Sequence, residues 1–231
     1  MPRNSAIFTP ETVRFFRQLS RNNHKPWMDA NRERYKQHVV APFRALLEAL
    51  SPAAIALDPS FDICGLTGVN FSRINRDIRF RPGAAPYHSH MYLTFSAQGE
   101  KGRSAGQLYA GIAADATTAG FRIYGEGKKE GKLFELAAPR ALKHAAWLAR
   151  QKKRLGRKYE SYWYATEKGE WTRREGWPLA PEDWKKIRGW IVRRRMNPAA
   201  AMRPQFTAEV ARIFRDLYPL YAFSSQPNWK G

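Results

Sequence analysis

The chain has 231 residues, of which 43% are hydrophobic and 13% aromatic. This composition supports a folded core and excludes an intrinsically disordered chain. Forty lysines and arginines against twenty aspartates and glutamates give a net charge of +20 at pH 7. An excess of this size predicts an anionic partner, with nucleic acid first, although a basic charge that serves only solubility is the alternative.

Location and cofactors are predicted from what the sequence lacks. Its first residues contain no long apolar run, and no stretch approaches the roughly 20 apolar residues that span a bilayer. We therefore expect a cytoplasmic protein with no membrane span. The single cysteine, Cys64, allows no intramolecular disulfide. HExxH, CxxC and a dinucleotide-binding GxGxxG are absent from the sequence, so we expect no cofactor. The oligomeric state stays open.

The segment 9–51 is predicted to be helical. A capping hydroxyl, a proline and an acid begin the first helix at Thr9-Pro10-Glu11, and Asn22-Asn23 ends it. A second helix is expected from about Trp27 to residue 51, with a bend or restart at Pro42.

The segment 60–126 is predicted to form the sheet, as an antiparallel meander. The expected strands are 71–80, 91–96, 107–113 and 121–124. Alternation puts His88, His90, Tyr92 and Thr94 on one face. The His88-x-His90 spacing lacks a third ligand nearby, so we predict a polar sheet face and no metal site.

The densest chemistry lies in 71–80, which contains Arg73, Arg76, Asp77 and Arg79. As a strand, this segment would turn one face inward. That face comprises Ile74, Arg76, Ile78 and Phe80. On the other face Asp77 and Arg79 could pair, which would leave Arg73 or Arg76 to hold an anion bidentately. The alternative is an arginine–aspartate network that only fixes the sheet.

The turn Asn22-Asn23-His24-Lys25 has two interpretations. It is a helix connection whose asparagines accept left-handed backbone conformations, or it places Asn23 and Lys25 beside the arginines. Tyr87, which follows Pro86, is expected near the same segment, where its phenol can bond to an anion or an acid.

The segment 127–223 is predicted to be basic, helical and aromatic. Residues 1–127 carry 16 basic and 10 acidic side chains, whereas residues 128–231 carry 24 and 10. A helix is expected to begin at Pro139, with Leu142, Ala145, Ala146 and Ala149 inward. Its outer stripe would be Lys143, Trp147, Arg150 and Arg154. This stripe suits a nucleic-acid backbone with one stacked base, and the alternative is a solvated face with Trp147 packed on a neighbouring loop.

The remaining elements are a strand, a short helix and a final helix. Residues 158–164 are predicted to be a strand because aromatic side chains favour strands. The short helix would start at Pro181 and run through Ile191 to the arginines 193–195, and the final helix would cover about 206–217. Trp171, Trp177, Trp184 and Trp190 are expected mostly in the core.

Three sets of residues together resemble the bacterial family called domain of unknown function 2461. The first is Arg73-x-x-Arg76-Asp77-x-Arg79-Phe80 followed by Pro86-Tyr87. The second is Asn22-Asn23-x-Lys25-x-Trp27 with Asn31, Tyr35 and Pro42, and the third is the helix 212–220 with Pro219. The resemblance spans most of the chain and implies an α+β domain without an established activity. Gly83-Ala84 stands where the family has Asp-Lys, so a role of that pair does not carry over.

We therefore predict one α+β domain over 1–231, with a central antiparallel sheet and N- and C-terminal helices packed on it. The first functional hypothesis is binding of nucleic acid or a phosphorylated small molecule. Its anion ligands would be Arg73, Arg76, Arg79, Asn23 and Lys25, and its nucleic-acid contacts the Lys143–Arg154 stripe. The alternative is an enzyme with a pocket around Arg73, Arg76, Asp77 and Tyr87 for a phosphate- or carboxylate-bearing substrate. Its catalytic candidates are Asp77 and Tyr87.

Overall fold

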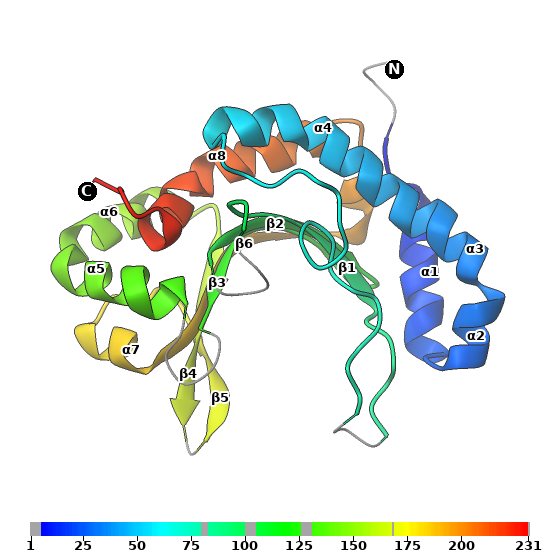
Figure 1. Cartoon of the computed structure of the whole chain (residues 1–231), viewed down its shortest axis with the longest axis horizontal. Helices are drawn as coiled ribbons and strands as arrows, with labels where there is room; N and C mark the ends of the chain where they lie inside the picture. Colours follow the sequence, from blue (N-terminus) through cyan, green and yellow to red (C-terminus); the bar gives the residue numbers. More distant parts are fainter. Residues whose placement is uncertain (1–5, 80–82, 100–104, 126–130, 168, 231) are drawn as a thin grey trace. The chain divides into compact units, whose positions relative to one another are not determined.

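The fold is α+β, as the sequence predicts, with a six-stranded antiparallel sheet and helices from both ends of the chain (Figure 1). The computed structural model describes residues 6–79, 83–99, 105–125, 131–167 and 169–230. The strands are β1 His90–Phe95, β2 Gln107–Ala113, β3 Thr117–Tyr124, β4 Glu160–Glu167, β5 Glu170–Glu175 and β6 Ile187–Met196. Their order in the sheet is β1-β2-β3-β6-β4-β5.

Helices precede the sheet, interrupt it and follow it. Those in the first quarter of the chain are α1 Pro10–Arg21, α2 Lys25–Ala30, α3 Arg32–Tyr35, the π-helical turn η1 Lys36–Val40, and α4 Ala41–Leu57. The later ones are η2 Leu133–Ala137, α5 Ala138–Lys143, α6 Ala145–Leu155, α7 Pro181–Lys186, η3 Pro198–Met202 and α8 Phe206–Ser225.

The chain divides into two compact units. Unit 1 comprises Met1–Thr94, Ala110–Thr118 and Met196–Ala211, and unit 2 comprises Phe95–Tyr109, Ala119–Arg195 and Arg212–Gly231. Each unit has its own aromatic core, described below.

The first helix begins and ends where the sequence predicts, with Pro10 at its first position and Asn22 after its last residue. Phe15 on α1 is fully buried. Its ring lies 5.5 Å from that of Trp27 and 5.7 Å from that of Tyr35, measured between centroids. These contacts hold α2 and α3 against α1 in unit 1.

Pro42 shapes the helical run that follows, as expected. Its ring nitrogen has no hydrogen to donate to the carbonyl of His38. Thr12 on α1 donates its hydroxyl to that carbonyl instead, at 2.6 Å. The turn just before α4 widens to the π-helical η1, in which the amide of Ala41 bonds to Lys36. The proline thus restarts the helix without leaving a buried acceptor unpaired.

The prediction that this helix ends near residue 51 is wrong, because α4 continues to Leu57 through Pro52. Leu46, Leu50 and Ala54 form one buried stripe on α4. Burial of this stripe on both sides of the proline outweighs the one backbone hydrogen bond that Pro52 removes.

By length and composition one helical run, Arg32–Leu57, could cross a membrane, and 33% of its apolar window is buried. Core helices of soluble proteins pass the same test, so this run by itself assigns no membrane role. The expectation that the chain has no membrane span stays a prediction.

The sheet differs from the prediction at two places. Residues 71–79 form no strand and make only isolated bridges, such as Asn75 to Tyr87. The sheet also extends beyond residue 126, because β4, β5 and β6 complete it. Strands β1, β2 and β3 lie where the sequence predicts, and β3 begins four residues earlier, at Thr117.

The helix that was expected to reach arginines 193–195 ends at Lys186, and β6 follows at once. In β6 Trp190 pairs with Trp163 of β4, and Ile191 pairs with Tyr162. Ile187, Trp190 and Ile191 are all buried. Isoleucine favours strands, and pairing with β4 buries both faces of β6, which outweighs the helical spacing of its apolar residues.

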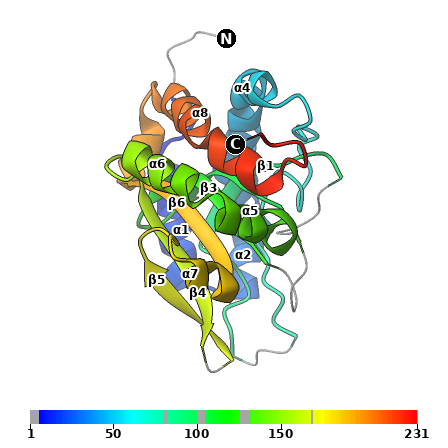
Figure 2. The same cartoon turned by 90° about the vertical axis from the view of Figure 1, so that its left-hand side faces the viewer.

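Trp190 is the centre of the core of unit 2. Its ring lies 5.5 Å from Phe121, 5.3 Å from Trp177 and 5.6 Å from Trp184. Its indole NH donates to the hydroxyl of Ser161 at 3.0 Å. Figure 2 looks onto the helices α5, α6 and α7 of this unit, with β6 and the β4–β5 pair beside them. Of the four tryptophans expected mostly in the core, Trp184 and Trp190 are buried, Trp177 is half-buried and Trp171 is exposed.

Candidate functional site

The arginine-rich segment forms one arm of an irregular hairpin in unit 1, and its second arm leads into β1 (Figure 1). The backbone N–H of His88 donates to the carbonyl of Ile74 at 2.7 Å, and that of Ser72 donates to the carbonyl of Tyr92 at 3.0 Å. Between these two pairs, three residues of the second arm oppose Arg73 alone. This is a bulge, a feature that is common beside functional sites.

The predicted inward face of this segment is wrong. Ile74 is half-buried, but Arg76 is exposed and Ile78 is 39% exposed. Phe80 lies outside the described residues. Because the arms form only isolated bridges and no ladder, no sheet face carries these side chains into a core. Arg76 instead donates from Nε to Nδ1 of His88 at 3.3 Å.

Arg79 and Asp77 form the predicted pair. Arg79 donates from Nε at 2.9 Å and from a terminal nitrogen at 2.6 Å to the two carboxylate oxygens of Asp77. These bonds lower the pKa of Asp77. A carboxylate with a lowered pKa is a poor general base near neutral pH. The pair therefore leaves Arg73 and Arg76 as the anion-binding candidates of this arm.

Asn23 holds the second arm of the hairpin. Its amide nitrogen donates to the carbonyl of Tyr87, and its amide oxygen accepts from the amide of Tyr87, both at 2.9 Å. Lys25 pairs with Asp29 at 2.7 Å. The pKa of Lys25 is raised by that hydrogen bond first, and also by the nearby Tyr87. The turn thus lies beside the hairpin, and Asn23 acts by positioning Tyr87, which is buried.

His88 and His90 lie on the same side of the chain as Tyr92, as the sequence predicts. The rings of His88 and His90 lie 5.0 Å apart, and those of His90 and Tyr92 lie 4.8 Å apart. Met91 and Leu93 are buried on the other side. Within the described ranges, no group of three or more His, Cys, Asp or Glu side chains is placed to hold a metal ion.

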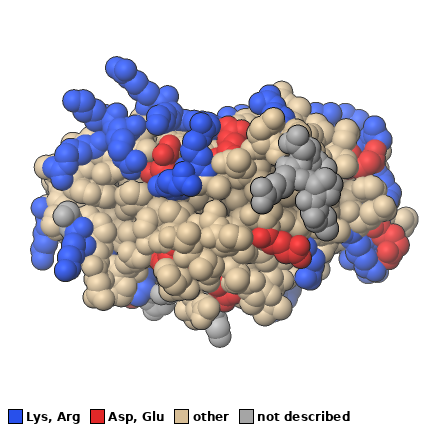
Figure 3. Space-filling model, turned by 90° about the horizontal axis from the view of Figure 1, so that it is seen from above, with Lys and Arg blue, Asp and Glu red and all other residues tan. Residues whose placement is uncertain are grey.

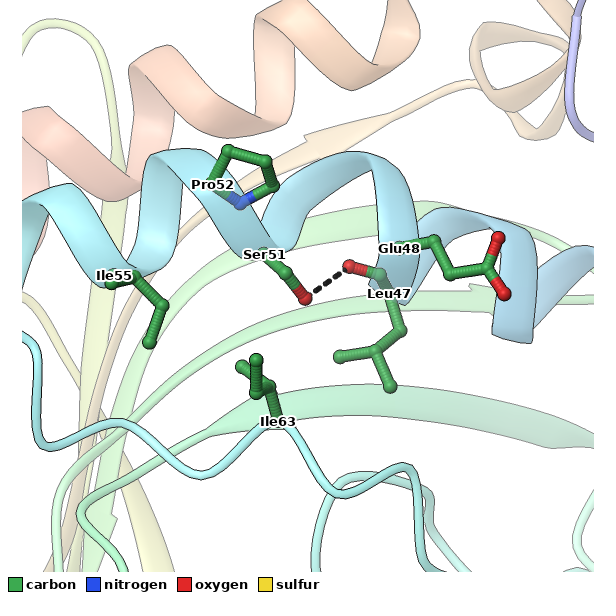
Figure 4. Close-up of a pocket in the computed structure, with 6 residues that line it drawn as sticks. All are labelled: Leu47, Glu48, Ser51, Pro52, Ile55 and Ile63. Atoms are coloured by element: carbon green, nitrogen blue, oxygen red, sulfur yellow. Dashed lines mark hydrogen bonds between the residues drawn. The ribbon is translucent and has the colours of Figure 1, made fainter. Parts of the chain in front are cut away.

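An open pocket of about 530 Å³, with no arginine among its lining residues, lies beside α4 in unit 1 (Figure 4). Its lining residues are Leu47, Glu48, Ser51, Pro52, Ile55 and Ile63. Ile63 points towards α4, and Ser51 donates its hydroxyl to the carbonyl of Leu47 at 2.7 Å. This pocket is mostly apolar, and its only charged lining residue is an acid, so it does not suit an anionic substrate.

The basic helix is interrupted. α5 ends at Lys143, His144 leaves the helical conformation, and α6 starts at Ala145. The predicted inward residues are therefore wrong. Leu142 is 48% exposed, and the alanines 145, 146 and 149 are exposed as well. The break changes the register, so that Ala141, Leu148 and Leu155 are buried instead.

Trp147 packs inside unit 2. Its ring stacks on Phe223 of α8, with centroids 4.6 Å apart and planes 10° apart. The ring of Trp229 meets it edge-on at 5.3 Å. Of the two interpretations of this stripe, the structure therefore shows the one in which Trp147 packs on a neighbouring part of the chain. Arg150 remains exposed on α6.

A cluster that sequence reasoning missed lies between α6, β6 and α8 of unit 2. Tyr159 is buried and donates its hydroxyl to Asp216 at 2.8 Å. Lys158 lies 3.8 Å from the same carboxylate oxygen, and Arg154 donates to the backbone carbonyl of Asp216 at 2.9 Å. The guanidinium of Arg194 lies 5.3 Å from the centre of the Tyr159 ring.

Burial raises the pKa of Tyr159, and the hydrogen bond to Asp216 raises it further, while Arg194 and Arg212 oppose this shift. The tyrosine is therefore neutral near pH 7. We call this set the Asp216 cluster; it comprises Arg154, Lys158, Tyr159, Arg194, Arg212 and Asp216. Of its four cations, Lys158 is paired with the carboxylate, and the other three contact the Asp216 backbone or lie near Tyr159. In the sequence, the signal was a lone acid directly after Arg215, four residues beyond Arg212.

Positive charge continues around this cluster. Exposed basic side chains next to it in the chain are Arg150, Lys153 and Arg157 of the α6 region and Arg215 of α8. Figure 3 shows lysine and arginine side chains gathered at its left-hand end, where Figure 1 places α6. No acid occurs between Glu135 and Glu160 in the sequence. We call these four residues, together with the Asp216 cluster, the basic surface of unit 2.

The fold and these sites define an α+β protein with arginine-bearing candidate sites in both units. A family described as "Conserved hypothetical protein (DUF2461)" matches residues 11–223, and the chain belongs to this family. None of the curated proteins compared with the chain matches it. At Gly83, φ is +78°, a backbone conformation that favours glycine.

Proposed function

We propose that the protein binds nucleic acid through the basic surface of unit 2. The observation that carries the proposal is the Asp216 cluster, in which four cationic side chains gather around Tyr159 and Asp216. Asp216 holds Lys158 and Arg154, and Arg194 lies over the ring of Tyr159, so these cations have defined positions. A surplus of ordered positive charge is what a phosphate backbone requires.

The distribution of the cations favours a polymer over a single phosphate group. They come from α6, β6 and α8, and those on the helices are exposed along the outer side of each helix. A small anion would be satisfied by two or three convergent donors. Phosphates that repeat along a strand can engage separate cations in turn, and each contact releases a bound counterion.

The test is a fluorescence anisotropy titration with labelled single-stranded RNA, single-stranded DNA and duplex DNA at several salt concentrations. With four to six phosphate contacts, log affinity should fall with log salt at a slope of about −3 to −5. Arg150→Glu and Arg212→Glu should each weaken binding and reduce the slope by about one.

The matched control is Arg203→Glu, which makes the same charge change at an exposed position of unit 1. It should retain wild-type affinity. Equal losses in all three variants would show that net charge alone is sensed. Absence of binding even at low salt would overturn the proposal.

A second candidate function is binding of a small phosphate- or carboxylate-bearing ligand at the hairpin of unit 1. It is favoured by the contact between Arg76 and His88 beside the bulge at Arg73, with Asp77 already engaged by Arg79. The lowered pKa of Asp77 favours binding over catalysis by this carboxylate.

Thermal unfolding with inorganic phosphate tests this second candidate. Added phosphate should raise the melting temperature of the wild type and not that of Arg76→Ala. Arg79→Ala is the control in the same arm, because Arg79 is engaged with Asp77, and it should retain the shift. The absence of a shift in the wild type would remove the candidate. Turnover of a small anionic substrate that is lost in Asp77→Asn would restore the enzymatic alternative.

A further inference from the structure

Unit 2 presents a second feature, on the sheet face opposite to the core of Trp190. The register places Tyr164 of β4 between Gly189 of β6 and Arg173 of β5. Trp171 lies two residues before Arg173 and therefore on the same face. The core face of these strands carries Trp163 and Trp190, which pair directly. The opposite face thus has its own set of aromatic side chains.

Three rings on this face form a cluster, contributed by three strands. The ring of Trp171 lies 6.4 Å from that of Tyr124 with planes 16° apart, and 5.9 Å from that of Tyr164. The rings of Tyr124 and Tyr164 lie 6.4 Å apart with planes 29° apart. We call Tyr124, Tyr164 and Trp171 the three-ring cluster.

Gly189 makes the cluster possible. Strand β6 separates β3 from β4, so a side chain on β6 would stand between Tyr124 and Tyr164. A Cβ atom at Gly189 would lie 2.6 Å from Cδ1 of Tyr124, closer than non-bonded carbon atoms approach one another in proteins. Because Gly189 has no side chain, the Tyr124 ring can lie across β6 and approach the rings of Tyr164 and Trp171.

The cluster is accessible from solvent. Trp171 is 48% exposed, and Tyr124 and Tyr164 are half-buried. Tryptophan contributes most when its large apolar surface is covered, and three other tryptophans of this unit are covered in the core. A tryptophan exposed to this extent beside two parallel tyrosines leaves ring surface for a ligand to cover.

Arginines lie on the same sheet face as the three rings. The guanidinium of Arg173 lies 3.9 Å from the centre of the Tyr162 ring, and that of Arg193 lies 5.0 Å from it. Arg193 also pairs with Glu160. On β3, Arg122 lies 4.8 Å from the centre of the Tyr109 ring. The tyrosine rings under these arginines are buried, so the arginines are held beside the exposed rings of the cluster. Exposed rings and arginines on one sheet face complement a ligand that combines flat bases with phosphates.

We propose that the three-ring cluster stacks unpaired bases, so that the protein prefers single-stranded nucleic acid to duplex. The inference rests on the proposed binding of nucleic acid, and it names the form that is bound. In a duplex the bases are stacked on one another and their faces are closed to side chains. In a single strand every base has a free face, and stacking on an aromatic side chain does not depend on sequence.

The experiment compares one labelled oligonucleotide as a single strand and as a duplex. Trp171→Ala should weaken single-strand binding about 5- to 150-fold and leave duplex binding unchanged. Trp171→Phe keeps a ring and should retain most of the affinity. The control is Leu142→Ala, which removes an apolar side chain that is also 48% exposed and should change neither affinity. Circular dichroism verifies that each variant is folded.

The outcomes separate the two proposals. If no nucleic acid binds, both fail. If single strand and duplex bind equally and Trp171→Ala changes neither, the basic surface remains and the stacking proposal falls. Equal losses for both ligands would make Trp171 a general contact and would also overturn single-strand stacking. Loss confined to the single strand, with rescue by phenylalanine, supports it.

Discussion

The ring of Tyr124 occupies the space that a side chain at Gly189 would need, with a separation of 2.6 Å between the Tyr124 Cδ1 atom and a Cβ atom at Gly189. Gly189 also pairs with Tyr164. One position without a side chain thus sets the distance between rings on β3 and β4. An alanine at this position must displace either the Tyr124 ring or the backbone of β6.

We predict that Gly189→Ala lowers the free energy of unfolding by about 1–3 kcal/mol through overpacking. Urea denaturation measures this loss. The control is the same substitution in a Tyr124→Ala background, where the clash is absent and the loss should largely disappear. An equal loss in both backgrounds would show that strain in β6, and not the Tyr124 ring, is the cause.

The two hydrogen bonds between the Asn23 side chain and the Tyr87 backbone give a second prediction. Asn23→Ala removes both hydrogen bonds to the Tyr87 backbone. It should lower the free energy of unfolding by about 1–3 kcal/mol, because two peptide groups lose their partner. Hydrogen exchange at the Tyr87 amide should accelerate. Asn23→Asp keeps the acceptor only and should give an intermediate loss. An unchanged rate of hydrogen exchange at the Tyr87 amide in Asn23→Ala would contradict this role of Asn23.

Thr12 and Pro42 give a third prediction, about the restart of the helix. Thr12→Val keeps the size of the buried side chain but removes the donor to the His38 carbonyl. The free energy of unfolding should fall by about 1–3 kcal/mol. Pro42→Ala restores a backbone N–H that can reach this carbonyl. The loss of unfolding free energy caused by Thr12→Val should therefore be smaller in the Pro42→Ala background. An equal loss in both backgrounds would show that the residue 42 N–H does not replace the Thr12 hydroxyl as donor to the His38 carbonyl.

Tyr162 gives a pH prediction. Burial raises the pKa of Tyr162 to about 12, compared with about 10 for a tyrosine in an unfolded chain. A pKa raised in the folded state contributes stability that is complete below about pH 10 and is lost as pH rises towards 12. Tyr162→Phe cannot ionise, so its free energy of unfolding should fall less over this range. Urea denaturation across the range tests this, and parallel curves for both proteins would refute it.

Local signals were sufficient for several parts of the fold. The threonine–proline–acid sequence at Thr9 marks the start of α1 because capping involves only neighbouring residues. Alternation located β1 and placed His88 and His90 on one face. The pairing of Asp77 with Arg79 could also be predicted, because two residues alone decide it.

Other parts depended on distant residues. β6 has the three-and-four spacing of a helix, and only its pairing with β4 makes it a strand. Trp147 lies on a basic helix, yet Phe223 and Trp229 from the end of the chain cover its ring. The sequence around Trp147 contains no sign of either partner.

The sequence by itself determined the α+β class, the family, the helix starts, three of the strands and the large positive charge. These depend on composition and on interactions within a few residues. Only the tertiary structure decided which charged and aromatic groups meet. Tyr159 and Asp216 are 57 residues apart in the chain, and Asn23 and Tyr87 are 64 apart. Such contacts form when packing elements bring distant segments together, so local propensity and periodicity contain no information about them.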